Sequence, residues 1–187
     1  RAMVSAQRAA QQQANGRDAE TAMAQRYLAD ALAFVSPRPP RLMAVGGLSG
    51  TGKSTLAAAL APDLPPAPGA LHIRTDLERK ALFGAGETER LPAEHYTLEA
   101  NARVYARVLD KARIALRAGH SVVVDAVFSK PEERAAIEAV AVVAGVPFDG
   151  VWLTAPREAM FERVTARTGD ASDATADVVI RQLGADP

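Results

Sequence analysis

A glycine-rich stretch that begins near residue 47 carries the residue types needed to hold a polyphosphate. The segment 41–55 is an apolar run followed by a turn, and Gly47, Gly52, Lys53 and Ser54 fit the pattern G-x-x-x-x-G-K-[ST]. Residues without a Cβ let successive backbone N–H groups converge on an anion at the positive end of a helix. The alternative is a glycine-rich turn that precedes Lys-Ser by chance. The apolar run before the turn and the helical segment after it favour phosphate binding.

This loop predicts ATP and Mg²⁺ as ligands, although no base-reading motif separates ATP from GTP. Lys53 is expected to reach the β- and γ-phosphates as a point charge, and the Ser54 hydroxyl to ligate Mg²⁺, which keeps most of its waters. The expected nucleotide-binding residues are Gly47, Leu48, Ser49, Gly50, Thr51, Gly52, Lys53, Ser54 and Thr55.

Two acidic residues follow apolar, β-branched runs. Asp125 ends Ser121-Val-Val-Val, the form of a buried parallel strand, so we expect it near the nucleotide's metal together with Ser54. The alternative is an aspartate that caps the next turn. Asp76 follows the strand expected over 70–73, at the sheet edge where α/β proteins bind ligands. Its plainer interpretation is an acidic residue in a first helical turn, with Thr75 and Glu78 forming a capping box.

Two arginines lie four residues apart on a helix expected over 156–167. Arg163 and Arg167 precede the break at Thr168-Gly169, and a final helix is expected over 174–183. A helix–loop–helix at this place is where small P-loop kinases carry a lid, and lid arginines neutralise charge on the transferred phosphoryl group. The alternative is a pair of solvated surface arginines.

The remaining patterns predict the elements that position these residues. Further strands are expected over 121–125 and 148–153. A long amphipathic helix is expected from Pro92 to Gly119, and another, with Ser129 and Glu132 as capping box, up to Gly145. Residues 83–90 are expected to form a mobile loop over the site. Tyr96 and Tyr105 are interpreted as core packing.

The N-terminal part differs in composition from the rest. Residues 1–16 are rich in Ala and Gln and predict a frayed helix or linker, whereas 18–35 have an apolar helical stripe. The prolines in 36–40 predict an extended connector. We therefore expect 1–36 to be a helical extension or the tail of a preceding domain, and 41–187 to be the catalytic domain, with a lid around 163–175.

Bulk composition excludes several classes of protein. Lys plus Arg equals Asp plus Glu at 22 each, so no net charge attracts nucleic acid. The chain has no Cys, which excludes disulfides and thiolate metal sites. It has neither a signal-like segment nor an 18-residue apolar span, so a cytoplasmic enzyme without membrane partners is expected. A start at Arg1 suggests part of a longer protein.

From about Arg41 onward, the chain resembles the small P-loop kinases related to polynucleotide 5′-kinase, zeta toxins and chloramphenicol phosphotransferase. It is most similar to bacterial P-loop kinase domains fused behind an aminoglycoside-phosphotransferase-like domain. The resemblance rests on Gly47-Leu-Ser-Gly-Thr-Gly-Lys-Ser, Asp76-x-x-Arg79, Val-Val-Val-Asp125 and Arg167-Thr-Gly.

The resemblance implies roles for individual residues. Asp76 would be the general base on the acceptor hydroxyl, and Arg79 and Asp125 would lie at the acceptor, Asp125 also near the metal. Arg167 would be the lid arginine. The spacing of Arg163 from Arg167, rather than the resemblance, makes Arg163 a second expected nucleotide contact. Lys53, Asp76 and Arg167 are thus the expected catalytic residues.

The fold expected is a P-loop NTPase three-layer α/β sandwich. Its parallel sheet should have the order 2-3-1-4(-5), with helices on both faces. The expected function is ATP- and Mg²⁺-dependent phosphoryl transfer to a hydroxyl of a small molecule. The alternatives are a polynucleotide 5′-kinase and a nucleotide-binding regulatory module of a larger two-domain protein. The acceptor and the oligomeric state do not follow from the sequence.

Overall fold

The computed structural model describes residues 1–11, 14–35 and 38–185. The chain divides into two compact units, Arg1–Arg38 and Pro39–Pro187. Each unit is described separately. Within the described residues, every helix falls short of the length and apolar character that a membrane crossing needs.

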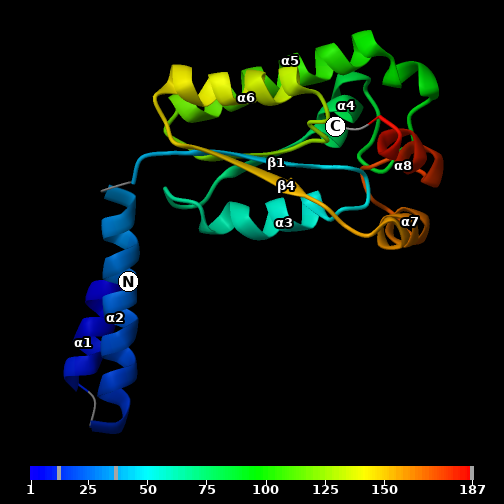
Figure 1. The fold of residues 1–187 in the computed structure, drawn as a ribbon. Coiled ribbons are helices and arrows are strands. Elements are labelled where there is room, and N and C mark those ends of the chain that lie inside the picture. Colours follow the sequence, from blue (N-terminus) through cyan, green and yellow to red (C-terminus); the bar gives the residue numbers. More distant parts are fainter. Residues whose placement is uncertain (12–13, 36–37, 186–187) are drawn as a thin grey trace. The chain divides into compact units, whose positions relative to one another are not determined.

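The first unit is a pair of helices that run side by side in opposite directions, α1 (Ala2–Gln11) and α2 (Ala14–Val35) (Figure 1). Residues 2–11 are thus helical, whereas Gln12 and Gln13 lie outside the described residues. Ser36 and Pro37 of the predicted connector also lie outside them. Much of the apolar stripe predicted on 18–35 is exposed in this unit, including Met23, Leu28, Leu32 and Val35.

The second unit is built on a parallel sheet of four strands in the order β2-β3-β1-β4. The strands are β1 (Leu42–Gly47), β2 (Leu71–Arg74), β3 (Val122–Asp125) and β4 (Phe148–Leu153). The predicted order 2-3-1-4 is confirmed, and the optional fifth strand does not occur in residues 38–185. The pairing places Arg74 of β2 and Val45 of β1 opposite Asp125.

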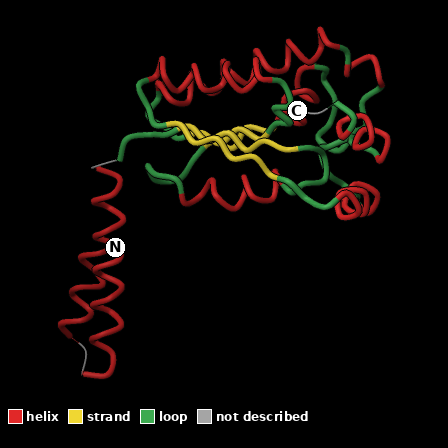
Figure 2. Tube along the Cα trace, viewed as in Figure 1, coloured by secondary structure: helices red, strands yellow, loops and turns green. Residues whose placement is uncertain are grey.

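Helices cover both faces of this sheet (Figures 1 and 2). One face packs against α5 (Leu98–Arg117) and α6 (Pro131–Ala144), and the other against α3 (Lys53–Leu60). The β3 valines are fully buried: Val122 and Val124 contribute to the first core and Val123 to the second, because successive side chains of a strand point to opposite faces.

The remaining helices gather at the carboxyl ends of the strands. They are α4 (Thr75–Leu82), α7 (Arg157–Ala166), α8 (Ala176–Leu183) and the 3₁₀ turn η2 (Ala93–Tyr96). A second 3₁₀ turn, η1 (Ala61–Asp63), follows α3 at the other end of the sheet, where the Ala61 carbonyl accepts the Ala70 N–H just before β2. A third apolar cluster joins α7 and α8 to the loop after β1, through Leu48, Met160, Val164 and Val179. This packing brings residues 167–175, which we call the α7–α8 loop, to the same end of the sheet as the glycine-rich turn.

The long helix predicted from Pro92 begins six residues later, at Leu98. Thr97 is its N-cap, and the Thr97 Oγ1 atom accepts a hydrogen bond from the Ala100 N–H at 3.2 Å. The preceding residues form η2 instead. The prediction was wrong because a proline that suits a first helical turn does not by itself choose between an α-helix and a short 3₁₀ turn.

Both predicted capping boxes were also wrong. Thr75 is the first residue of α4, and its hydroxyl donates to the Asp125 carbonyl at 3.2 Å, while Glu78 pairs with Arg107 and Lys111 of α5. Tertiary partners therefore replace the local ones. In α6 the cap lies one residue later than predicted, at Lys130, whose N–H donates to Glu133 at 3.4 Å, because Pro131 occupies the first helical position.

Candidate active site

The turn between β1 and α3 has the backbone conformation that the glycines allow. Gly50 and Gly52 have φ angles of 84° and 98°, and Gly52 is the N-cap of α3. An added Cβ on Gly50 would lie 2.6 Å from the Met160 carbonyl oxygen of α7. Only glycine therefore suits this position, and the first N–H groups of α3 are left without intrahelical partners, as an anion site requires.

Lys53 lies at the start of α3, and its ammonium folds back over the turn. Its Nζ donates to the Leu48 carbonyl oxygen at 2.9 Å. Burial lowers the pKa of this amine, whereas the nearby carboxylates Asp125 and Asp76 act in the opposite direction. Lys53 is therefore a cation with two acidic neighbours in a partly dehydrated place.

Asp76 and Asp125 are brought together from two strand ends. Asp76 lies in the first turn of α4, after β2, and Asp125 is the last residue of β3, 4% exposed. Burial raises the pKa of the Asp76 carboxyl, and the negative charge of Asp125 raises it further. Arg74 Nε and His72 Nε2 lie 3.6 and 3.8 Å from Asp125 Oδ2. Two side chains of β2, Arg74 and His72, thus flank Asp125.

The residues predicted to hold Mg²⁺ both line one cavity. Ser54 brings a hydroxyl from the first turn of α3, and Asp125 a carboxylate from β3. Within the described residues, no three His, Asp or Glu side chains are grouped so as to hold a metal by themselves. A donor set of one hydroxyl and one carboxylate fits Mg²⁺, because that ion keeps several waters and completes its shell with phosphate oxygens.

Arginines from two segments meet at Asp170 of the α7–α8 loop. Arg74 Nη2 donates to Asp170 Oδ1 at 2.9 Å, and Arg167 Nε lies 3.2 Å from Oδ2. Burial opposes ionisation of Asp170, but the hydrogen bond and charge of Arg74 and the charge of Arg167 lower its pKa overall. The sequence analysis singled out Arg167 but missed Arg74 and Asp170.

The glycine-rich turn also receives side chains from α7 and α8. Arg163 Nη1 donates to the Gly50 carbonyl oxygen at 3.0 Å, and the Gln182 side-chain oxygen accepts the Ser49 N–H at 2.8 Å. Thr51 is buried, and its hydroxyl donates to the Leu48 carbonyl at 2.8 Å. Arg163 and Gln182 therefore brace the turn from outside, and Thr51 braces it from within.

Arg79 is buried and holds η2 against α5. Its Nη1 donates to the His95 carbonyl at 2.8 Å, its Nη2 to Asn101 Oδ1 at 2.6 Å, and its guanidinium carbon lies 4.8 Å from the centre of the Tyr96 ring. Tyr96 is 40% exposed rather than a core residue, which corrects the prediction. Tyr105 does pack against the core, and its hydroxyl accepts the Phe128 N–H at 3.3 Å.

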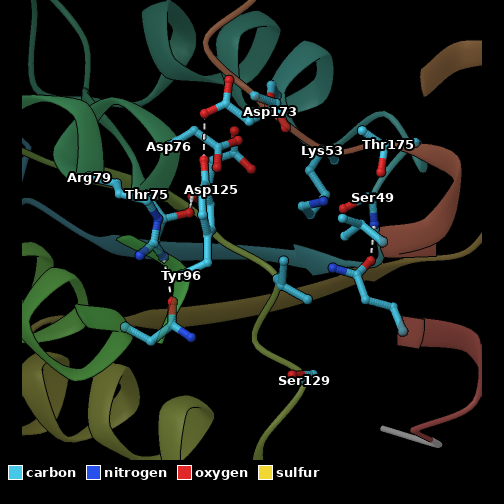
Figure 3. Close-up of a pocket in the computed structure, with 18 of the residues that line it drawn as sticks. Ser49, Lys53, Thr75, Asp76, Arg79, Tyr96, Asp125, Ser129, Asp173 and Thr175 are labelled. Carbon is cyan, nitrogen blue, oxygen red and sulfur yellow. Dashed lines mark hydrogen bonds between the residues drawn. The ribbon is translucent and has the colours of Figure 1, made fainter. Parts of the chain in front are cut away.

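A cavity of about 1220 Å³ joins these groups. Figure 3 shows Lys53 facing Asp76 and Asp125 across it, with Arg79, Tyr96 and Asp173 behind the two carboxylates. The predicted site residues that line it are Ser49, Gly50, Gly52, Lys53, Ser54, Thr55, Asp76, Arg79, Asp125 and Arg167. Four predicted residues do not belong to the lining: Gly47 ends β1, Leu48 and Thr51 are part of the turn, and Arg163 contacts the turn from α7. Lining residues that the sequence analysis did not assign include Tyr96, Asp170, Asp173 and Gln182.

A parallel sheet of order 2-3-1-4, a glycine-rich turn after β1 and carboxylates at the ends of the neighbouring strands define a P-loop kinase fold. Residues 42–185 match the family AAA_33, an AAA domain, and the chain belongs to this family. The uncharacterized protein Rv2004c of Mycobacterium tuberculosis is 35% identical over 167 residues, which are 87% of this chain and 33% of that protein. The chain thus spans about a third of the length of the curated relatives it matches.

Solved structures share the fold. A putative kinase of Chloroflexus aurantiacus is 21% identical with a TM-score of 0.57, covering 70% of this chain and 68% of that one. A gluconokinase of Sinorhizobium meliloti is 24% identical with a TM-score of 0.53, covering 80% and 77%. The APS kinase CysC of Mycobacterium tuberculosis, in complex with AMPPNP and APS, is 25% identical with a TM-score of 0.55, covering 70% and 71%.

Proposed function

We propose that this chain is a kinase that transfers the γ-phosphoryl group of ATP to a hydroxyl group of a small-molecule acceptor. The observation that carries the proposal is the shared cavity, because Lys53, Asp76 and Arg167 all line it. Phosphoryl transfer needs positioning and charge neutralisation more than covalent catalysis. A cation at the phosphates, a base at the acceptor and a lid arginine together meet that need.

Each group has a distinct part in the proposed reaction. Lys53 and the first N–H groups of α3 bind the phosphates, and Arg167 neutralises charge on the transferred group. Asp76 accepts the proton of the acceptor hydroxyl, for which its raised pKa suits it better than an ordinary aspartate at neutral pH. Ser54 and Asp125 would hold Mg²⁺, which would supply positive charge at the phosphates when bound.

A sequence motif supports the proposed nucleotide site, whereas the proposed acceptor site rests on the residues that line the cavity. The nucleotide site has a specific loop, and the similar APS kinase is known with AMPPNP and APS bound. The acceptor side has residues of mixed character, including Leu91, Tyr96, Asn101 and Glu133. We propose that Arg79 acts at this side by holding η2 and Asn101 in place.

Two alternatives remain as outcomes of the same test. The chain shares its fold with a structure titled as the Pnkp1/Rnl/Hen1 RNA repair complex, at 15% identity and a TM-score of 0.56, covering 79% of this chain and 44% of that one. A net charge of zero disfavours a polynucleotide acceptor. The greater length of the relatives is compatible with a regulatory module beside an attached phosphotransferase-like domain, in a cytoplasmic protein.

The experiment is a screen with γ-labelled ATP and Mg²⁺ against sugars, polyols, amino alcohols, antibiotics and 5′-hydroxyl oligonucleotides. A labelled small molecule, formed by the parent protein and not by Lys53→Ala, supports the proposal. Label on oligonucleotides alone favours the polynucleotide kinase. Tight ATP binding without transfer to any acceptor favours the regulatory module and refutes the proposed activity.

A further inference from the structure

Asp173, in the α7–α8 loop, gathers three hydrogen-bond donors from the opposite side of the cavity. Its Oδ1 lies 3.2 Å from Lys80 Nζ, and its Oδ2 accepts the Leu91 N–H at 3.1 Å and the Tyr96 hydroxyl at 2.5 Å. These donors come from α4, from the segment after it and from η2, 77 to 93 residues earlier in the chain. One carboxylate therefore joins the α7–α8 loop to three separate elements.

Lys80 is a buried cation that needs a negative partner, and Asp173 is that partner. The Lys80 side chain is 2% exposed, and its ammonium also donates to the Glu89 carbonyl oxygen at 2.5 Å. A buried ammonium is costly without a counter-charge, and Asp173, itself 10% exposed, supplies it. Withdrawal of the α7–α8 loop would leave Lys80 buried without that carboxylate, so the pair favours the arrangement in which the loop lies against α4.

The joined residues form the cavity wall next to Asp76. Lys80 follows Asp76 by four residues on α4, one helical turn later, and Leu91, Tyr96 and Asp173 all line the cavity. Figure 3 shows Tyr96 and Asp173 near Asp76. Burial opposes ionisation of Asp173, but hydrogen bonds from Tyr96, from the Leu91 N–H and from Lys80 lower its pKa overall.

The same loop reaches the nucleotide side through a second carboxylate. Asp170, three residues before Asp173, holds Arg74 and Arg167. The α7–α8 loop thus has one acidic residue that holds Arg74 and Arg167 and another that holds the wall around Asp76. The two carboxylates have separate partners, so a substitution at Asp173 leaves the contacts of Asp170 with Arg74 and Arg167 in place.

We infer that Asp173 is a positioning residue for the acceptor: its carboxylate holds Leu91 and Tyr96 in the wall beside Asp76 whenever the α7–α8 loop lies over the cavity. The inference rests on the proposed kinase function, because a wall beside Asp76 matters only if an acceptor binds there. It assigns Asp173 no contact with the reacting atoms.

The kinetic test compares Asp173→Ala and Tyr96→Phe with the parent protein, using an acceptor found in the screen. Asp173→Ala should raise the KM for the acceptor about tenfold or more, because it removes a charged group that accepts several hydrogen bonds. Tyr96→Phe should raise this KM about two- to tenfold, because it removes one of those hydrogen bonds. The Kd of ATP, measured by calorimetry, should stay unchanged in both. The double variant should have the same acceptor KM as Asp173→Ala, because the Tyr96–Asp173 hydrogen bond is already lost in that single variant.

A second readout needs no kinase activity. The Arg90–Leu91 peptide bond is a trypsin site whose Leu91 N–H is held by Asp173, and Arg90 is exposed. Trypsin should cleave this bond faster in Asp173→Ala than in the parent, because proteolysis follows local opening. Asp177→Ala is the matched control: it removes an exposed acidic residue in the first turn of α8, outside the cavity lining.

The outcomes separate this inference from the proposed function. Unchanged acceptor KM together with unchanged cleavage at Arg90 in Asp173→Ala overturns the inference. Equal losses of ATP binding and acceptor binding also overturn it, because they indicate a general structural role. A parent protein that phosphorylates nothing defeats the proposed function instead, and the cleavage rate then decides whether Asp173 holds this wall. Should Asp173→Ala fail to fold, Tyr96→Phe provides the same two readouts.

Discussion

Asp76 is the proposed general base, and its carboxylate also lowers the stability of the folded protein at neutral pH. Burial and the neighbouring Asp125 raise its pKa in the folded protein above the ordinary value of 3.8. An acid with a raised folded-state pKa binds protons more tightly in the folded chain, so stability falls as the pH rises from the unfolded-state pKa through the folded-state pKa. At neutral pH an ionised Asp76 therefore destabilises the fold that it serves.

We predict that Asp76→Asn lowers phosphoryl transfer by about 10²–10⁴, the range for loss of a general base. The same change should raise the Tm at neutral pH, and the gain should shrink as the pH falls through the raised pKa of the parent carboxyl, because that carboxyl then takes up a proton. Rate assays and thermal unfolding at several pH values test both parts. A variant that transfers phosphate at the parent rate would remove Asp76 from the mechanism.

Lys53 provides a second prediction at the scale of one residue. Lys53→Ala should weaken ATP binding about tenfold or more, because a charge-assisted contact with the phosphates is lost. Turnover should fall as well. Calorimetry with ATP measures the affinity. Arg113→Ala is the control, since Arg113 forms an exposed ion pair with Asp110 on α5, and an equal loss in that variant would contradict a specific role for Lys53.

At the scale of elements, the glycine-rich turn depends on how closely α7 packs against it. Gly50→Ala would bring a Cβ to 2.6 Å from the Met160 carbonyl oxygen, at a φ of 84°. We predict a lower Tm, with strain of about 1–3 kcal/mol, and weaker ATP binding, because α7 or the turn must move. Gly84→Ala is a matched control: it also has a positive φ, of 70°, but meets nothing within 4 Å.

The comparison of these two variants separates backbone strain from the clash. Thermal unfolding and calorimetry give both quantities for each variant. Gly84→Ala should lower the Tm less than Gly50→Ala and leave the ATP affinity unchanged. Identical effects of the two substitutions would mean that the approach of α7 to the turn does not matter for the nucleotide site.

At the scale of the molecule, the second unit contains the whole sheet and all three apolar clusters. Those clusters are formed by residues between Leu42 and Val179, and the cavity is lined by residues between Ser49 and Ala185. We predict that a fragment of residues 39–187 folds cooperatively and binds ATP with the affinity of the full chain. Thermal unfolding and calorimetry of the fragment check this, and an unfolded fragment would show that the first unit is needed for stability.

Sequence patterns accounted for the framework of this protein because its signals are local. The β-branched run at 122–124, the glycines at 47–52 and Gly145 at the end of α6 fix a strand, a turn and a helix end through short-range sterics. The order 2-3-1-4 was expected from these elements together with the resemblance to small P-loop kinases, because the rules for parallel sheets alone leave other orders open. The juxtaposition of Lys53, Asp76 and Asp125 then follows, because parallel strands end at one edge.

Tertiary structure alone decided which side chains serve as partners across that edge. Thr75 and Glu78 match a local capping box, yet Thr75 bonds the Asp125 carbonyl and Glu78 pairs with α5. Asp173 meets Lys80 and Tyr96 across 93 and 77 residues, a separation that leaves no periodic signal in the chain. The residues that we propose to bind phosphate follow from the sequence itself. The wall that faces them is made by contacts between distant segments, whose energies depend on burial and on partners that only the folded chain brings together.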